Sequence, residues 1–149
     1  MGPGDRDRTQ CRRRVRPLAG RPVKAILDTN LLVAEALSHR DYQVAVSSLS
    51  WAELGFGVRA VANPIERARR ETRMARLRAI LGAGIPFDDA AADAYETACG
   101  LVLASGRLVR GRAIDLMIAA TAAAHGAVVL TRNADDFAGL EGLVTVVSG

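Results

Sequence analysis

The chain has 149 residues, of which half are hydrophobic, 24% are charged and only 4% are aromatic. This length fits one globular domain, and so high an apolar content excludes wholesale disorder. The scarcity of aromatic residues argues against single-strand binders that stack bases on exposed rings.

The net charge of +4 is unevenly distributed along the chain. Residues 1–22 hold seven arginines against two aspartates, a balance of +5, whereas residues 23–149 hold 13 Lys and Arg against 14 Asp and Glu, a balance of −1. Gly and Pro interrupt residues 1–22 without periodicity, which predicts a basic, disordered arm that the fold does not need. The alternative is an arm that binds nucleic acid.

The first 22 residues also bear on the cellular compartment. Pro17, Gly20 and Pro22 stand where the apolar part of a signal peptide would have to be, so export is not expected. Cys11 and Cys99 are 88 residues apart and give no disulfide framework or metal clip. These features favour a cytoplasmic protein.

From Val23 onward, short β-rich runs alternate with helical ones, and residues 23–149 are expected to form one domain. Strands are predicted at residues 24–27, 44–47, 85–87, 127–131 and 143–147, and helices at 31–38, from Ser50 onward, 64–81, 89–105 and 112–125. The strand cores are continuously apolar, which is typical of a parallel sheet covered on both faces. The pattern therefore predicts an α/β three-layer sandwich around a mostly parallel five-stranded sheet.

Acidic residues occupy positions that a structural role explains only in part. Asp28 directly follows the first strand, where its structural role would be to cap a helix. Glu53 would complete an S-x-x-E capping box with Ser50, yet from a helix start it would also project toward the strand ends. Asp115 stands in a helix that is apolar all round and hence buried, where an unpaired carboxylate is costly.

The turn after the predicted strand 127–131 carries more polar residues. It reads T-R-N-A-D-D-F over residues 131–137, which is typical of a solvated turn. However, this turn and Asp28 both belong at the carboxyl edge of a parallel sheet, where ligands bind in such folds.

Several carboxylates in one crevice need a cation. Each pair about 4 Å apart repels by roughly 4 kcal/mol at an effective dielectric of about 20. The two histidines, His39 and His125, show no ligand spacing, so the donors are oxygens, and these favour Mg²⁺ or Mn²⁺. Such ions activate water and neutralise charge in phosphodiester hydrolysis.

Four segments carry a resemblance to a known family. They are I-L-D-T-N (26–30), S-x-x-S-W-A-E-L-x-x-G-V (47–58), D-L-M-I-A-A-T-A (115–122) and L-T-R-N-A-D-D-F (130–137). In this order and spacing the chain resembles PIN-domain ribonucleases and, within that superfamily, the VapC toxins of bacterial toxin–antitoxin pairs. The resemblance runs from about Val23 to Val147 and does not include the arm.

The resemblance implies a metal-dependent endoribonuclease that cuts cellular RNA and inhibits growth. Its catalytic acids would be Asp28, Glu53, Asp115 and one acid of the last segment, where Asn133, Asp135 and Asp136 are candidates and Asp136 is favoured. Metal would bind at Asp28 and Asp115, and Thr29, Asn30 and Thr131 would support the metal or the phosphate. The family further implies a homodimer and a cognate antitoxin that covers the acidic site.

Other interpretations stay open at this point. Six arginines of the predicted helix 64–81 form either a solvated face or a surface that holds RNA; they are Arg67, Arg69, Arg70, Arg73, Arg76 and Arg78. Alternative functions are a stand-alone PIN nuclease of RNA processing, a receiver-like signalling domain, and a non-catalytic interaction module. A receiver would need paired acids after its first strand and a Lys near its end, whereas this chain has a lone Asp28 and Lys24 as its only Lys.

Overall fold

The computed structural model describes residues 22–35 and 41–149. The predicted arm, apart from Pro22, lies outside these residues, as do Cys11 and His39. In chain order the elements are β1 (Val23–Leu27), α1 (Thr29–Val33), β2 (Tyr42–Val46), α2 (Ser48–Arg59), α3 (Pro64–Leu81), α4 (Asp89–Ala104), α5 (Ala113–Ala124), β3 (Val128–Thr131), the 3-10 helix η1 (Ala134–Phe137) and β4 (Val146–Ser148).

The strands form one parallel sheet in the order β2-β1-β3-β4. Ile26 of β1 is paired with Ala45 of β2 on one side and with Val129 of β3 on the other. The chain first adds β2 on one side of β1 and later returns to add β3 on the other side. The direction in which strands are added therefore reverses at β1. The α/β fold with a parallel sheet is thereby confirmed.

The sheet has four strands within the described residues, so one of the five predicted strands, that at 85–87, is wrong. Ile85 makes a single bridge to Ser47, in which its amide donates to the Val46 carbonyl at 2.7 Å and its carbonyl accepts from Ser48 at 2.9 Å. Pro86 follows and has no N–H to donate, which ends the pairing after one residue.

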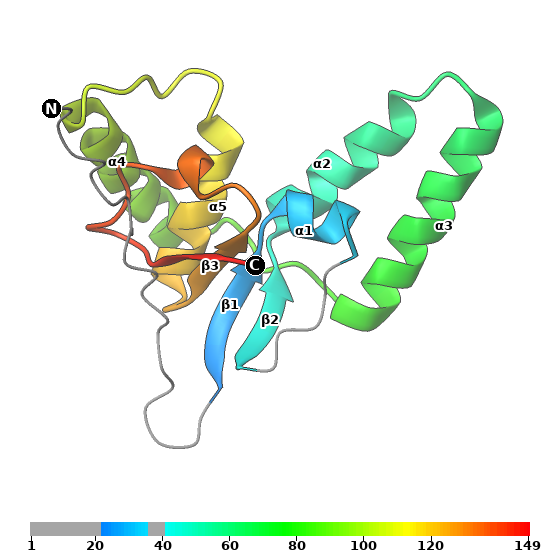
Figure 1. Cartoon of the computed structure of the whole chain (residues 1–149), viewed down its shortest axis with the longest axis horizontal. Coiled ribbons are helices and arrows are strands. Elements are labelled where there is room, and N and C mark those ends of the chain that lie inside the picture. Colours follow the sequence, from blue (N-terminus) through cyan, green and yellow to red (C-terminus); the bar gives the residue numbers. More distant parts are fainter. Residues whose placement is uncertain (1–21, 36–40) are drawn as a thin grey trace, which may run out of the picture.

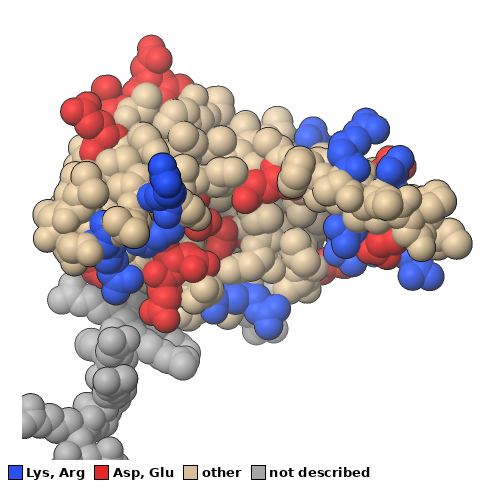
Figure 2. Space-filling model, turned by 90° about the horizontal axis from the view of Figure 1, so that it is seen from above, with Lys and Arg blue, Asp and Glu red and all other residues tan. Residues whose placement is uncertain are grey.

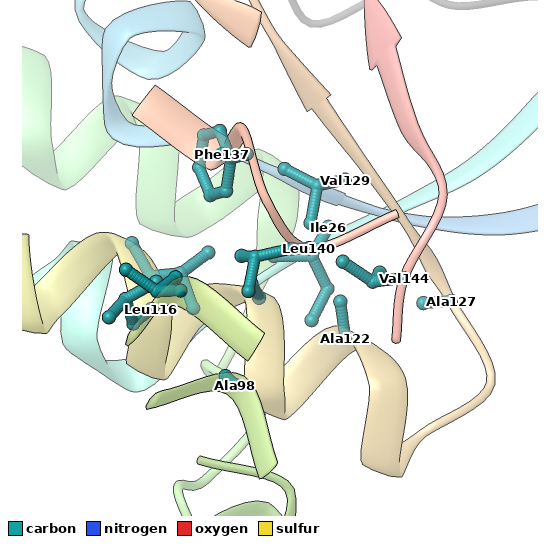
Figure 3. Packing of buried hydrophobic residues seen from close by; sticks show 12 residues of the cluster. Ile26, Ala98, Leu116, Ala122, Ala127, Val129, Phe137, Leu140 and Val144 are labelled. Carbon is teal, nitrogen blue, oxygen red and sulfur yellow. The ribbon is translucent and has the colours of Figure 1, made fainter. Parts of the chain in front are cut away.

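Helices cover both faces of the sheet, giving three layers (Figure 1). On one face, Ile26 and Val129 pack with Leu116 of α5 and Phe137 of η1 (Figure 3). On the opposite face, Leu27 and Leu130 pack with residues of α1, α2 and α3, including Trp51 and Leu77. Alternate residues of β1 and β3 are therefore buried on opposite sides, which explains why these strands read as continuous apolar runs.

Helices α2 and α3 form a hairpin that projects from the rest of the molecule (Figure 1). Asn63 caps α3 by accepting from the amides of Ile65 and Glu66, and Pro64 takes the first helical position. Most of the α3 arginines make contacts of their own. Arg67 and Arg70 donate to the carbonyls of residues 61 and 57, Arg73 and Arg76 pair with Glu35, and Arg78 lies over the Trp51 ring.

Two predicted helix boundaries are wrong. Helix α2 is capped by Ser47, whose hydroxyl accepts from the Leu49 amide, so Ser50 is fully buried inside the helix and forms no capping box with Glu53. The helix predicted at 31–38 is α1, which ends at Val33 because Glu35 adopts a left-handed conformation with a φ of 56°.

Candidate active site

Asp28 lies at the carboxyl end of β1, where it is only 4% exposed. One carboxylate oxygen, Oδ1, accepts a hydrogen bond from the Thr29 amide at 2.7 Å, so Asp28 also caps α1. The other oxygen, Oδ2, accepts from the Thr131 hydroxyl at 2.7 Å. The Asp28 side chain therefore caps α1 and also lies at the strand ends, where the candidate site is expected.

Thr131 joins the ends of β1 and β3 through a small polar network. Its hydroxyl oxygen accepts from the Asn30 side-chain amide at 3.1 Å and from the Asn133 backbone amide at 3.0 Å, while it donates to Asp28. The side-chain oxygen Oδ1 of Asn30 in turn accepts from the Arg132 backbone amide at 3.2 Å. The structure thus places Asn30 and Thr131 in one hydrogen-bond network with Asp28.

Glu53 reaches the same place from α2. Its Oε2 atom accepts a hydrogen bond of 2.5 Å from the hydroxyl of Thr29, the residue that follows Asp28. Since Glu53 is the sixth residue of α2, its side chain points at the site from within the helix rather than from its capping turn. Thr29 links two of the predicted acids, to Asp28 through its amide and to Glu53 through its hydroxyl.

Asp115 lies in the first turn of α5, the most apolar helix of the fold, and is half-buried. Its pKa is raised from 3.8 to about 6, first by burial and then by the negative charges of Asp28, Asp136 and Glu53, with Arg112 acting in the opposite direction. The negative charge of each of the other three acids raises the pKa of Asp115, so all four carboxylates lie in one region at the carboxyl end of the sheet.

Burial also raises the pKa of Asp28, although its hydrogen bonds from Thr131 and Thr29 lower it. The charge of Asp136 adds to the increase. Asp135 is exposed and acts on neither Asp28 nor Asp115, whereas Asp136 is half-buried and acts on both. Of the two neighbouring acids in η1, Asp136 is therefore the one that the fold directs into the cluster.

The donor set suits a hard divalent cation. Asp28 and Asp115 offer carboxylate oxygens. The pKa of each is raised by burial and by the negative charge of neighbouring acids, so a bound cation would stabilise their ionised forms. Within residues 22–35 and 41–149, no three His, Cys, Asp or Glu side chains are already spaced around a common ion position. Mg²⁺ commonly binds through one or two carboxylates and keeps several waters, so a site built on Asp28 and Asp115 fits it.

The face of the molecule at the carboxyl ends of the strands carries charges of both signs. Figure 2 looks down on the end of the molecule to which the strands point, and it shows acidic and basic side chains exposed together on this face. Basic groups on the same face as acidic ones are suited to a polyanion that must approach a metal-binding centre.

One residue of this region has no signal in the sequence. Arg112, directly before α5, donates through Nε to the Asp136 backbone carbonyl at 3.1 Å and through Nη2 to the Ala138 carbonyl at 3.2 Å. An arginine at a helix start is ordinary, and its acceptors are backbone carbonyls 24 and 26 residues away. Neither the arginine nor its backbone acceptors form a sequence pattern from which this contact could be predicted.

Comparison with known proteins decides the family. The PIN domain family model matches residues 25–143. The chain belongs to the PIN domain family. The alternative of a receiver-like signalling domain is therefore wrong.

Solved structures place this PIN domain more closely. A structure of VapBC-5, a member of the VapBC family of toxin–antitoxin systems from Mycobacterium tuberculosis, is 37% identical with a TM-score of 0.70, covering 85% of this chain and 98% of that one. FitAcB from Neisseria gonorrhoeae is 26% identical with a TM-score of 0.66, covering 83% and 96%. VapBC2 from Rickettsia felis, bound to a DNA fragment from its promoter, is 21% identical, has a TM-score of 0.70, covers 85% and 98%, and shows the fold alone.

No curated protein matches the chain. The family model and the VapBC structures together make it a VapC-like PIN-domain nuclease. No helix in the described part of the chain is long and apolar enough to cross a membrane.

Proposed function

We propose that this PIN-domain protein is a divalent-metal-dependent endoribonuclease and the toxin of a toxin–antitoxin pair, which hydrolyses phosphodiester bonds in cellular RNA and so inhibits translation and growth. The observation that carries the proposal is Asp115, a half-buried carboxylate whose pKa is raised to about 6 by burial and by three other acids. A fold that needed only stability would not hold four carboxylates there, because removing any one would relieve repulsion.

In this proposal Asp28 and Asp115 hold Mg²⁺ or Mn²⁺, with Glu53 and Asp136 completing the catalytic acids. The bound ion would supply activation of an attacking water and neutralise charge on the transition state. Thr131 and the Thr29 amide hold both oxygens of Asp28 in fixed directions. Glu53, held by the Thr29 hydroxyl, can accept a proton from a water beside it.

The polar residues beside the acids complete the proposed substrate site. Thr29, Asn30 and Thr131 carry hydroxyl and amide groups at the same edge of the sheet and would contact the phosphate. Hydroxyls and amides are common partners of nucleic-acid phosphates; Thr29 and Asn30 are partly exposed, whereas Thr131 is fully buried and would act through its bond to Asp28.

The partner proposal rests on the relatives. The 37% identical structure is of a VapBC toxin–antitoxin system, and the gonococcal one is of FitAcB. We infer that this chain has a cognate antitoxin that covers the acidic site, and that it forms a homodimer in the cytoplasm. Residues 23–149 would be the PIN-like domain, and residues 1–22 a basic arm outside it. A neighbouring reading frame that encodes a DNA-binding domain and a tail would support this proposal over a stand-alone nuclease of RNA processing.

The experiment is a cleavage assay on structured RNA with the purified full-length protein. Cleavage should require added Mg²⁺ or Mn²⁺, stop with EDTA, and be lost in Asp28→Asn. Cleavage that EDTA does not diminish, or that persists in the variant, would show that the four acids are not the catalytic centre.

A further inference from the structure

Arg112 connects the two segments that carry Asp115 and Asp136. Its backbone belongs to the start of α5, where its carbonyl accepts from the Leu116 amide at 3.0 Å. Its side chain extends to η1, where the guanidinium donates twice to the Asp136 carbonyl and once to the Ala138 carbonyl. The same residue is thus fixed to the helix of one acid and to the backbone of the other.

Few other contacts would fix the direction of the Asp136 side chain. The 3-10 helix η1 has only four residues, and its Asn133 start has no capping side chain among the residues described. Phe137 is buried in the core and anchors the segment (Figure 3), and the turn's own backbone bonds are long, 3.3 Å from the Asp136 amide to the Asn133 carbonyl and 3.2 Å from the Ala138 amide to the Asp135 carbonyl. Short 3-10 turns have poor internal hydrogen-bond geometry, so an external donor decides the orientation of the peptide groups.

The guanidinium holds two peptide groups of this segment through their carbonyls, that of Asp136 before Phe137 and that of Ala138 after it. The bond to the Asp136 carbonyl fixes the plane of the peptide that follows Asp136. The bond to the Ala138 carbonyl fixes a second point of the same segment relative to Arg112. Hydrogen bonds from a charged donor are stronger than neutral ones, and the planar fork of arginine matches two adjacent acceptors in a way that the lysine ammonium does not.

We infer that Arg112 is a positioning residue of the proposed nuclease, which sets the separation of the Asp115 and Asp136 carboxylates by holding η1 against the start of α5. The inference rests on the proposed function for its catalytic consequence, while the contact itself belongs to the fold. Arg112 acts through Asp136 and not on the RNA.

The first test measures kcat and KM for a structured RNA with Mg²⁺ in the full-length protein. Arg112→Ala should lower kcat by about 10- to 100-fold, the range typical of residues that orient a metal site, and leave KM within about twofold. Arg112→Lys keeps the charge but not the fork, so it should lose most of the same activity. The control, Arg110→Ala, removes an exposed arginine two residues away and should leave kcat unchanged.

Chemical rescue and a double-mutant cycle then separate positioning from general damage. Guanidinium ion at low millimolar concentration should restore part of kcat in Arg112→Ala and none in Arg112→Lys. Arg112→Ala should add little loss to Asp136→Asn, yet multiply the loss of Glu53→Gln. Losses that multiply in both backgrounds, or full activity in Arg112→Lys, would overturn the inference.

Hydrogen exchange supplies a readout that does not depend on activity. Amides of residues 136–140 should exchange at least tenfold faster in Arg112→Ala, with little change in β1 and β3. If wild-type protein cleaves no RNA, the proposed function fails, but exchange still decides whether Arg112 holds η1. Unchanged exchange in an active protein would overturn the positioning role alone.

Discussion

The hydroxyl of Thr131 donates to the Asp28 carboxylate at 2.7 Å, although the two residues are 103 positions apart in the chain. They meet because β1 and β3 are adjacent parallel strands that end at the same edge of the sheet. Through this bond the end of β3 fixes the orientation of the proposed metal ligand on β1.

Replacing Thr131 by Val should weaken both the site and the fold. Valine has the shape of threonine but cannot donate to Asp28, so the pKa of Asp28 should rise further from its already raised position. The Asn30 and Asn133 N–H groups also lose their acceptor. We expect the free energy of unfolding to fall by about 1–3 kcal/mol in urea denaturation and Mg²⁺ affinity to fall in calorimetry. Thr131→Ser keeps the hydroxyl and should retain most of the stability and most of the Mg²⁺ affinity. Equal losses in the two variants would show that the hydroxyl does not orient Asp28.

Replacing Asp115 by Asn should separate stability from activity. The variant keeps the shape of the side chain and removes a charge that Asp28, Asp136 and Glu53 repel, so metal-free protein should be at least as stable as wild type in thermal melts. RNA cleavage should fall by orders of magnitude because the metal loses an anionic ligand. Wild type expressed without its antitoxin should arrest growth, and the variant should not. A variant that unfolds while its folded fraction cleaves normally would make Asp115 a structural carboxylate.

The pH dependence of stability follows from the same carboxylate. The folded-state pKa of Asp115 is about 6 against an ordinary value of 3.8, so between these pH values the folded protein binds more protons than the unfolded chain. Stability from this group is therefore complete below about pH 4 and is lost as pH rises through 6. In EDTA, the melting temperature of Asp115→Asn relative to wild type should increase from pH 4.5 to pH 7. Added Mg²⁺ should reverse this trend in wild type, and a constant difference across that range would show that Asp115 ionises normally.

The sequence predicts the cluster because its residues follow from strand ends and from one anomalous helix. Asp28 directly follows one apolar strand and Thr131 is the last residue of another, and parallel strands bring such residues to one edge. Asp115 is conspicuous because the other residues from 113 to 120 on its helix are all apolar. The sequence does not distinguish Asp135 from Asp136, since only the direction in which η1 turns directs the second into the cluster.

Tertiary contacts decide what local pattern leaves open. Ser47, Ser50 and Glu53 are spaced by three, so the cap of α2 fits either serine, and the bridge between Ser47 and Ile85 is what ends β2 and starts the helix at Ser48. Arg112 escapes prediction because its partners are backbone carbonyls, which every residue carries.

Gly84 supports the start of α2 by its lack of a side chain. A Cβ atom there would lie 2.6 Å from the Ser48 backbone nitrogen and 2.7 Å from its Cα atom, far inside contact distance. Ser48 is the first residue of α2, and the adjacent Ile85 pairs with Ser47, so neither backbone can move without breaking the bridge or shifting the helix.

Replacing Gly84 by Ala should therefore lower the free energy of unfolding by about 1–3 kcal/mol, the usual cost of overpacking a tight site. Because the methyl group displaces the helix that carries Glu53, RNA cleavage by the folded variant should fall as well. The matched control is Gly100→Ala in the interior of α4, where an added Cβ meets nothing within 4 Å. There alanine should stabilise by about 0.5–1 kcal/mol, because glycine loses more backbone entropy in a helix. Urea denaturation of both variants checks the pair, and a Gly84→Ala protein as stable and active as wild type would show that α2 does not depend on this contact.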